Sequence, residues 1–495
     1  MDKIKRQTKQ NDLRWRAVVG VYLLGMAFFV SLQSPMNPFH VSLGGVDSCV
    51  FHYVASVMEK GGQMYRDTFD HKGPLLYFIN YLGLKISYYS GAWFLELLTL
   101  VVWVFLTEKT ARLFCNARSA CIVVFLSVSA LLNCFFGGNF PEVYTLPCIS
   151  GALYIFTDYF WNRKITGLRL ILCGGLLGCA LMLKPNTIAV WIVFSLAVLV
   201  DCLRTGTWKK LPRFLGLFLV GLLAVLLPVL GYLMANGIFG DFVKTYLLFN
   251  TRYAGTADLM AKVLTLSRFL CSEWALPCLI AAGWLFGREK EKRFYWGTFL
   301  LCLLLSVLLS GMSGNSYTYY RITMVPCYAV PLAALLRKVR YDREHGEQLA
   351  ALAMGTAAVF SLLWFQPIFA TLQMLKHSTR EIDLGDEHHQ AVFSLIEEYT
   401  TPEDPIIVYG NEDSFYFYSH RFAASRYSFQ YPIILMDETI RTEFFEDLEQ
   451  QKPKLLIVQS LWCDDEYIEG FLQTHPEYKL LTDFDDYAVY EHTGT

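Results

Sequence analysis

Residues 168–201 read LRLILCGGLLGCALMLKPNTIAVWIVFSLAVLVD, and only Lys184-Pro185-Asn186 separates one apolar run from the next. Each run approaches the roughly 20 apolar residues that cross the ~30 Å hydrocarbon core of a bilayer. A chain that leaves one such run and enters another with almost no loop is typical of two membrane helices in direct succession. The stretch therefore predicts a multi-span α-helical membrane protein.

The composition of the whole chain supports this prediction. Of its 495 residues, 54% are hydrophobic and only 17% are charged, and the apolar residues gather into long runs. We expect eleven transmembrane helices, with boundaries good to about 2–4 residues. They lie at 17–33, 91–107, 119–136, 147–160, 168–183, 187–201, 214–234, 266–286, 295–311, 322–336 and 349–370.

The Lys and Arg residues predict the orientation of these spans, because basic residues concentrate in short cytoplasmic segments. If the N-terminus is cytoplasmic, six inner segments hold 24 of the 42 Lys and Arg residues. An odd number of spans then places the C-terminus outside. The inner segments are Lys3 to Arg16, Lys109 to Arg118, Arg163 to Arg169, Arg204 to Arg213, Arg288 to Arg293 and Arg337 to Arg343.

Two domains are expected, a transmembrane catalytic domain over 1–370 and a soluble domain over 371–495. The second carries 25 acidic and 8 basic residues, as suits an extracytoplasmic tail. Short β-branched and aromatic runs alternate there with helix-like segments, which predicts a small α/β domain. The expected strands are 405–410, 454–458 and 487–490, and the expected helices are 387–399 and 438–451.

The first outer loop, 34–90, is too long and too patterned for a simple connection. Apolar residues from Val50 to Met58 recur at helical spacing, which predicts an interfacial amphipathic helix that ends at Gly61-Gly62. A second apolar stretch, 74–87, is either interfacial or a short membrane element. The distribution of basic residues argues against a full span there, because one more crossing would move the basic loops outside.

The 13 cysteines show no ligand spacing and lie mostly inside the expected spans. Neither a metal site nor a disulfide framework is predicted, no cofactor is expected, and a divalent cation is not indicated. The first apolar run lacks a cleavage pattern and is expected to remain as a span.

Asp47 is the first candidate for chemistry. A carboxylate at the outer membrane boundary, at the start of a helix, can accept a proton from an incoming hydroxyl. The alternative is an N-cap for the helix over 48–60, and one residue can serve in both ways.

Three cations, Arg66, Lys72 and Lys184, are expected near the outer boundary, where charge-assisted hydrogen bonds would hold a phosphate group. The alternative is that their charged ends simply extend toward water. Lys184 lies between two apolar runs, so its charge requires a partner or a water-filled cavity. Asp70 and His71 precede Lys72 and are candidate substrate ligands.

Asn139 and Glu142 stand three residues apart where the fourth span begins, which fits either a capping box or an outer polar site. Arg252, Tyr319 and Tyr320 are expected on outer loops, as substrate ligands or, for the tyrosines, as part of an aromatic belt. Two further polar groups are interpreted as solvated surface, namely His388-His389 and Asp464-Asp465-Glu466.

These residues together resemble the GT-C class of polyprenol-dependent glycosyltransferases, in the bacterial branch related to protein mannosyltransferases and lipid A aminoarabinose transferase. The matching parts follow one another in the expected order over about 140 residues. They are Asp47, Tyr65-Arg66-Asp67 with Asp70-His71-Lys72-Gly73-Pro74, Gly138-Asn139 with Glu142 and Tyr144, and Leu183-Lys184-Pro185-Asn186.

The resemblance implies an enzyme of the bacterial plasma membrane. It would move a monosaccharide from an undecaprenyl-phosphate carrier to a hydroxyl of a surface glycan, lipid or protein. The catalytic acid of the family corresponds to Asp47, phosphate binding to Lys72 with Arg66 and Lys184, and acceptor positioning to Glu142. The bilayer is the remaining partner, and no nucleic acid is expected.

Two departures from the family pattern limit the resemblance. Asp47 is followed by Ser48 rather than Glu, which argues against the protein mannosyltransferases and their protein acceptors. Where relatives carry His-Tyr-Tyr, this chain reads Thr318-Tyr319-Tyr320.

Direct displacement of the polyprenyl phosphate would invert the anomeric centre.

The first alternative function is a flippase for a lipid-linked sugar, although related halves are absent from the sequence. A noncatalytic scaffold is the second, and it leaves Asp47 and the Lys-Gly-Pro sequence unexplained.

Overall fold

The structure is a computed structural model that describes residues 2–256, 258–341, 364, 367–374, 376, 382–431, 433–460 and 466–494. The chain forms two compact units. The first comprises Met1–Ser34, Trp93–Gly231 and Thr251–Lys376, and the second comprises Pro35–Ala92, Tyr232–Asn250 and His377–Thr495. The first outer loop therefore folds together with the C-terminal segment.

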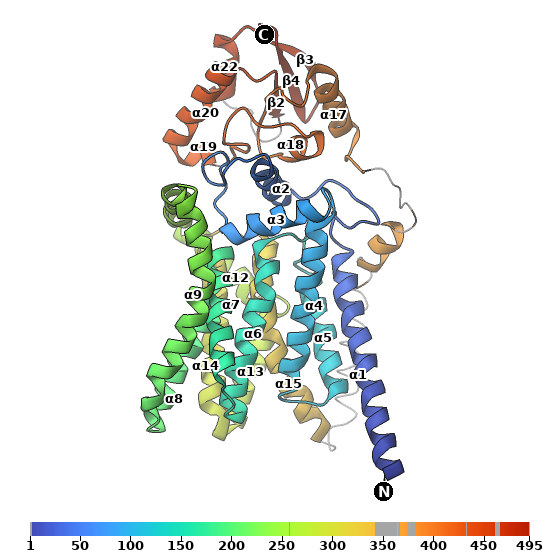
Figure 1. Cartoon of the computed structure of the whole chain (residues 1–495), viewed down its shortest axis with the longest axis vertical. Coiled ribbons are helices and arrows are strands. Elements are labelled where there is room, and N and C mark those ends of the chain that lie inside the picture. The colour runs from blue at the N-terminus through green and yellow to red at the C-terminus, as the bar shows by residue number, and fades with distance from the viewer. Residues whose placement is uncertain are drawn as a thin grey trace. The chain divides into compact units, whose positions relative to one another are not determined.

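Helices make up the first unit, and most of them are long and run side by side (Figure 1). They are α1 (Asp2–Ser31), α4 (Gly91–Ala111), α5 (Ala117–Leu132), α6 (Pro141–Asn162), α7 (Gly167–Leu183), α8 (Ala189–Arg204), α9 (Leu211–Ala235), α11 (Asn250–Thr256), α12 (Leu259–Leu270), α13 (Ala275–Arg288), α14 (Arg293–Gly311) and α15 (Val325–Tyr341).

Within the described residues, five helical segments are long and apolar enough to cross a membrane. The expected span 266–286 is not continuous, because α12 and α13 are bent by 67° where the chain breaks between them. Residues 342–363, most of the expected eleventh span, lie outside the described part. The multi-span helical architecture is thus present, while eleven remains a predicted number. The five segments are Arg14–Ser31, Gly91–Ala111, Trp208–Ala235, Lys290–Gly311 and Thr318–Lys338.

Small residues allow α7 to approach α9 closely. A Cβ atom on Gly174 of α7 would collide with the carbonyl of Phe218, and one on Gly221 of α9 would collide with that of Ile171. Glycines at such a crossing bring two membrane helices into backbone contact, where dispersion holds them together. The Gly-rich part of residues 168–183 is therefore a helix-packing surface.

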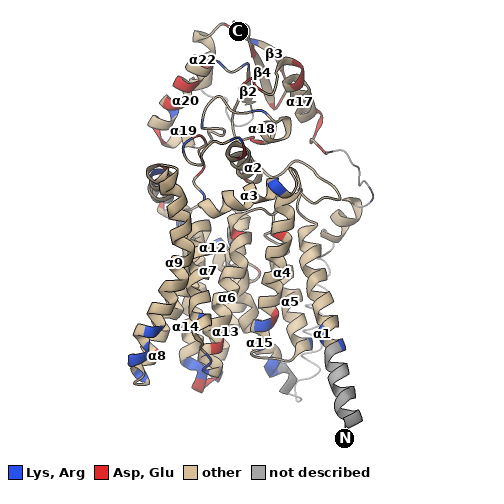
Figure 2. Ribbon diagram, viewed as in Figure 1, with Lys and Arg blue, Asp and Glu red and all other residues tan. Residues whose placement is uncertain are grey.

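Basic side chains gather at one end of the first unit, the end at which α1 begins and α8 finishes (Figure 2). Apolar helices whose Lys and Arg residues are concentrated at one end are typical of membrane helices with basic cytoplasmic loops. The orientation of the chain in a membrane remains a prediction.

The second unit is built on a four-stranded sheet of order β1-β2-β4-β3. β1 and β2 are parallel, with Ile406 opposite Leu455, whereas β2–β4 and β4–β3 are antiparallel. β3 had not been expected from the sequence. The strands are β1 (Ile406–Tyr409), β2 (Leu455–Gln459), β3 (Tyr478–Asp483) and β4 (Tyr487–His492).

Helices from three parts of the chain complete this unit (Figure 1). α3 has 13 residues, about 20 Å at 1.5 Å per residue, and is therefore too short to cross a bilayer. The helices are α2 (Val46–Glu59), α3 (Pro74–Ile86), α10 (Phe239–Phe242), α17 (Glu387–Tyr399), α18 (Ser414–Ser419), α19 (Ile433–Met436), α20 (Glu438–Gln451) and α22 (Glu466–Thr474).

The predicted helix that ends before Gly61 is present as α2, but the expectation that it has a polar face turned to solvent is wrong. Its residues from Ser48 to Ser56 are all buried, including the polar positions that were expected to face solvent. His52 packs against Phe417 with 4.8 Å between ring centres. The periodicity was misleading because protein surrounds the helix, so both faces are covered.

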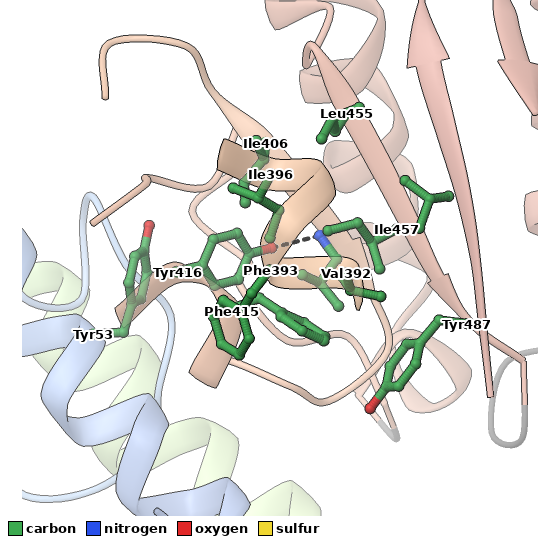
Figure 3. Close-up of a cluster of buried hydrophobic side chains, with 12 residues drawn as sticks. Tyr53, Val392, Phe393, Ile396, Ile406, Phe415, Tyr416, Leu455, Ile457 and Tyr487 are labelled. Atoms are coloured by element: carbon green, nitrogen blue, oxygen red, sulfur yellow. Dashed lines mark hydrogen bonds between the residues drawn. The ribbon is translucent and has the colours of Figure 1, made fainter. Parts of the chain in front are cut away.

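The core of the second unit lies between the sheet, α17, α18 and α2 (Figure 3). β1 is an edge strand, so one side of its backbone needs other partners. The Tyr416 hydroxyl accepts a hydrogen bond from the Val408 N–H at 2.6 Å, and Ile406 forms a bridge with Ala423. The aromatic stretch from Phe415 to Tyr418 therefore has a structural role.

Candidate active site

The candidate residues fall into two groups, one in each unit. Asp47, Arg66, Asp70, His71 and Lys72 belong to the second unit. The first unit contains the remaining six, namely Asn139, Glu142, Lys184, Arg252, Tyr319 and Tyr320.

Asp47 lies in the first turn of α2 and is partly exposed. The alternative that it caps this helix is wrong, because the N-cap is Gly45 and no side chain caps the helix. A carboxylate in a first turn is favoured by the partial positive charge of the helix N-terminus. Asp47 is therefore held by its backbone position, and its carboxylate is not used to close the helix.

The buried Asp70 and the partly buried Lys72 form an ion pair close to Asp47. The Asp70 carboxylate accepts hydrogen bonds from the Tyr77 hydroxyl at 2.9 Å and from the His71 N–H at 2.8 Å. The Lys72 Nζ lies 3.7 Å from Asp70 and 3.1 Å from the His71 Nε2. Burial raises the pKa of Asp70 and Asp47 raises it further, whereas Lys72 and Tyr77 lower it.

Two buried tyrosines hold this loop in shape. The Tyr65 hydroxyl donates to the Lys72 carbonyl at 2.8 Å, and the Tyr77 hydroxyl accepts from the Lys72 N–H at 3.1 Å. Tyr65 itself has φ +68°, a backbone conformation that residues other than glycine seldom adopt. The Lys72 backbone is therefore fixed, and its ammonium group contacts Asp70 and His71 instead of simply extending toward water.

Arg66 is less enclosed than Lys72. Its side chain is 47% exposed, donates to the carbonyl of Gly237 and lies 3.3 Å from the Asp241 carboxylate on α10. In the described structure Arg66 joins two segments of the second unit.

Asp413, which the sequence did not single out, also belongs to this group. It precedes α18, is fully buried, and accepts a hydrogen bond from the Ser428 hydroxyl at 2.6 Å. Burial raises the pKa of Asp413 to about 8, and the neighbouring Glu412 and Asp70 add to the rise. Only the fold brings an acid from position 413 near position 70, so no local pattern could have revealed it.

The raised pKa of Asp413 predicts a pH-dependent stability. A native pKa near 8, against about 4 in the unfolded chain, means that folded Asp413 keeps a proton that the unfolded chain releases between those values. Its contribution to stability is therefore lost as the pH rises from about 4 to about 8. We expect Asp413→Asn, which cannot ionise, to reduce this loss and to be more stable by a few kcal/mol near pH 8.

Thermal unfolding of the detergent-solubilised chain between about pH 5 and pH 8 measures this effect. Asp404→Asn is the matched control, because hydrogen bonds from Thr401 lower the pKa of Asp404, whose titration then lies below that window. Equal pH slopes for the natural chain and Asp413→Asn would contradict the prediction.

In the first unit, Glu142 and Lys184 form an ion pair between α6 and the end of α7. Glu142 is fully buried, and the Lys184 Nζ also lies 3.8 Å from the ring centre of Tyr320. The expectation that Lys184 needs a partner is confirmed. The capping-box alternative is wrong, because Phe140 is the N-cap of α6 and no side chain caps it.

Glu96 is a second residue that sequence reasoning missed. It lies fully buried in α4 and accepts a hydrogen bond from the Asn139 N–H at 2.6 Å, while the Asn139 side chain accepts from the Tyr144 hydroxyl at 2.9 Å. A Cβ atom on Gly138 would collide with the Glu96 carboxylate. The signal was available, because an acid inside an apolar span needs a partner or a function.

The other expected ligands of the first unit occupy different environments. Tyr319 stacks on Phe140 with 4.2 Å between ring centres, and Arg252 lies exposed on α11. Residues 464 and 465, interpreted as surface, fall outside the described part. No group of three or more His, Cys, Asp and Glu residues in the described part is arranged to hold a metal ion.

The two groups supply complementary chemistry. The group around Asp47 combines a partly exposed carboxylate with a largely buried ammonium, so it can accept a proton and bind an anion. The group around Lys184 combines a cation with a buried acid and an aromatic ring.

Solved structures show the fold to which this chain is similar. ArnT from Cupriavidus metallidurans bound to undecaprenyl phosphate has a TM-score of 0.62 and 14% identity, covering 97% of this chain and 98% of that chain. The Archaeoglobus fulgidus oligosaccharyltransferase, tethered to an acceptor peptide, has a TM-score of 0.51 and 12% identity, covering 97% and 74%. The predicted resemblance to the GT-C class is confirmed as a likeness of fold.

Sequence comparison identifies a family directly. No curated protein matches the chain. The family model described as "Putative competence-induced protein Ccs4 N-terminal domain" matches residues 8–375, well over half of the 495 residues. The chain therefore belongs to the competence-induced protein Ccs4 N-terminal domain family.

Proposed function

We propose that this protein is a membrane glycosyltransferase. It moves a monosaccharide from a polyprenyl-phosphate carrier to a hydroxyl of a cell-surface glycan, lipid or protein. The observation that carries the proposal is the grouping of Asp47, at the start of α2, with the Asp70–Lys72 ion pair. This grouping combines a base for the acceptor with a cation for a departing phosphate.

The structural neighbours support the class of donor. ArnT was solved bound to undecaprenyl phosphate, and the oligosaccharyltransferase was solved tethered to an acceptor peptide. A fold that handles a lipid phosphate in one protein does not determine the substrate of another. The assignment here therefore depends on the residues of this chain.

In the proposed reaction, Asp47 removes the proton of the acceptor hydroxyl as its oxygen attacks the anomeric carbon. The bond between that carbon and the phosphate oxygen breaks, and polyprenyl phosphate leaves with the electron pair. Lys72, Arg66 and Lys184 stabilise the negative charge that develops on the phosphate. A single displacement of this kind inverts the anomeric centre.

The remaining candidates position substrates. We assign Glu142 to acceptor positioning, in keeping with its buried ion pair to Lys184. The residues proposed to contact the sugar or the acceptor are Asp70, His71, Asn139, Arg252, Tyr319 and Tyr320.

We further propose that the chain crosses the bacterial plasma membrane eleven times, with a cytoplasmic N-terminus and residues 371–495 outside. The basic end of the first unit supports this orientation (Figure 2). A soluble acidic segment outside the membrane would meet surface glycans there.

Transfer of labelled sugar by the purified chain in liposomes tests the proposal. The liposomes contain a panel of undecaprenyl-phosphate sugars, and the surface-glycan fraction of the expressing bacterium supplies acceptors. Labelled glycan whose first-formed product has inverted anomeric configuration by NMR supports the proposal. Retention would defeat the single displacement. Movement of intact lipid-linked sugar across the bilayer without transfer would identify a flippase instead.

A further inference from the structure

A cavity of about 490 Å³ lies within the second unit, at the end of α2 away from Asp47. Its walls come from the last turn of α2, from the loop that contains Asp67, from Tyr88 and from residues 402–422. This volume falls in the range of about 300–1,000 Å³ that is typical of small-ligand sites. None of its lining residues belongs to the group around Asp47.

Rigid aromatic rings form part of the wall. Tyr88 is stacked on Phe417 with 4.6 Å between ring centres and an angle of 5°, and its hydroxyl donates to the Phe417 carbonyl at 3.1 Å. The His420 ring packs against Tyr88 at 4.6 Å. Such fixed rings offer an apolar surface for the C–H face of a ligand at little entropic cost.

The polar part of the wall contains both donors and acceptors. Arg421 is only 8% exposed, and three of its N–H groups bond to Thr400 and Ser419, which fixes the guanidinium in place. Lys60 lies on the same wall, and Asp67 and Glu403 supply carboxylates.

This mixture selects the kind of ligand. Acidic side chains outnumber basic ones in the wall, so a phosphate or sulfate would meet net repulsion. The charged lining residues are Glu59, Asp67, Glu403, Lys60 and Arg421. Sugar hydroxyls donate and accept hydrogen bonds at once, so carboxylates and Arg N–H groups can both be satisfied. An uncharged sugar ring, with polar edges and an apolar face, fits this cavity best.

His420 lies in the cavity wall at a position whose backbone suits glycine. This residue ends α18 with φ +57°, a left-handed conformation that glycine adopts with less strain. Its Nε2 lies 3.1 Å from the Tyr89 hydroxyl, which orients the ring at the cavity. Glycine can therefore replace His420 without backbone strain, so a variant that lacks the imidazole should keep the fold.

We propose that this cavity binds an uncharged sugar unit of the acceptor glycan, remote from the hydroxyl that reacts. This inference rests on the proposed function for the identity of the acceptor. Asp47 and Glu59 are twelve residues apart on α2, about 18 Å along its axis, so the acceptor must extend over several sugar units. Binding of this remote sugar would hold long acceptors more tightly than short ones.

The test uses His420→Gly, which removes the imidazole and suits the left-handed backbone. Lys452→Gly is the matched control, because Lys452 ends α20 with φ +47° and lies outside the cavity. The probe is a fluorescent oligosaccharide, cut from the surface polysaccharide of the expressing bacterium and separated by length. Binding to the full-length chain is measured without any donor. We expect His420→Gly to bind about tenfold more weakly and Lys452→Gly to bind as the natural chain does.

A second variant, Glu403→Gln, replaces an exposed carboxylate in the cavity while keeping its size, and should also weaken binding. Equal binding of the long oligosaccharide by the natural chain, His420→Gly and Glu403→Gln would overturn the proposal. So would failure of the natural chain to bind any length of oligosaccharide.

The outcomes separate this inference from the proposed function. Binding that depends on His420, in a chain that transfers no sugar, would leave the cavity assigned and refute the transferase. Transfer to long acceptors that requires Asp47 but is unchanged by His420→Gly would support the transferase and refute the sugar site in the cavity.

Discussion

The Asp47→Asn variant is expected to transfer sugar at least about a hundredfold more slowly than the natural chain, because a positioned general base contributes roughly 10²–10⁴-fold. Asparagine has nearly the same shape but cannot accept the proton of the acceptor hydroxyl. Because the Asp47 side chain is not the cap of α2, its replacement should leave the helix in place. Initial rates in liposomes at saturating donor and acceptor measure the effect.

Two controls accompany this variant. Asp47→Glu keeps the charge near the start of α2 but moves the carboxylate by one methylene, so it should preserve stability and recover only part of the rate. Thermal unfolding of each variant shows whether the fold is intact. If stable Asp47→Asn transferred sugar at the natural rate, Asp47 would have no catalytic role.

The Lys184→Met variant is expected to lose about 3–5 kcal/mol of stability, because it leaves the Glu142 carboxylate buried without a counter-charge. Glu142 is fully buried, and one of its carboxylate oxygens, Oε2, has no hydrogen-bond partner among the described residues. The lost stability would appear as a lower unfolding temperature in detergent and a lower yield of inserted protein.

Combining Lys184→Met with Glu142→Gln removes both charges and should restore most of the stability, since an uncharged pair avoids the isolated buried ion. This double variant separates structure from function. If Lys184 binds the donor phosphate or Glu142 positions the acceptor, the double variant folds but transfers sugar slowly. Natural activity in the double variant would mean that Lys184 serves only to neutralise Glu142.

Some features of the protein follow from its sequence because they depend on local physics. An apolar run such as 168–183 must be buried in lipid or protein wherever it lies in the chain, so a helical membrane protein was predictable. The requirement for a partner at Lys184 follows in the same way, from the cost of an isolated charge among apolar residues. Asp47 and the Lys72 region were recognised by their order along the chain.

Other features depend on which surfaces meet, and these appear only in the tertiary structure. The partner of Lys184 is 42 residues away, and Asp413 comes within electrostatic reach of Asp70 across more than 300 residues. His52 is buried although the helical periodicity predicted a solvent-facing position, because α3 and α18 cover both faces of α2.

The sequence by itself therefore determined the class of protein, the apolar helices and the residue types available for chemistry. The tertiary structure decided the pairing of Glu142 with Lys184, the acid at Asp413 and the cavity beside His420. The physical reason is that the free energy of moving an apolar segment out of water depends on the composition of that short segment alone. Ion pairs, raised pKa values and cavities depend on contacts between distant segments, which only the folded chain brings together.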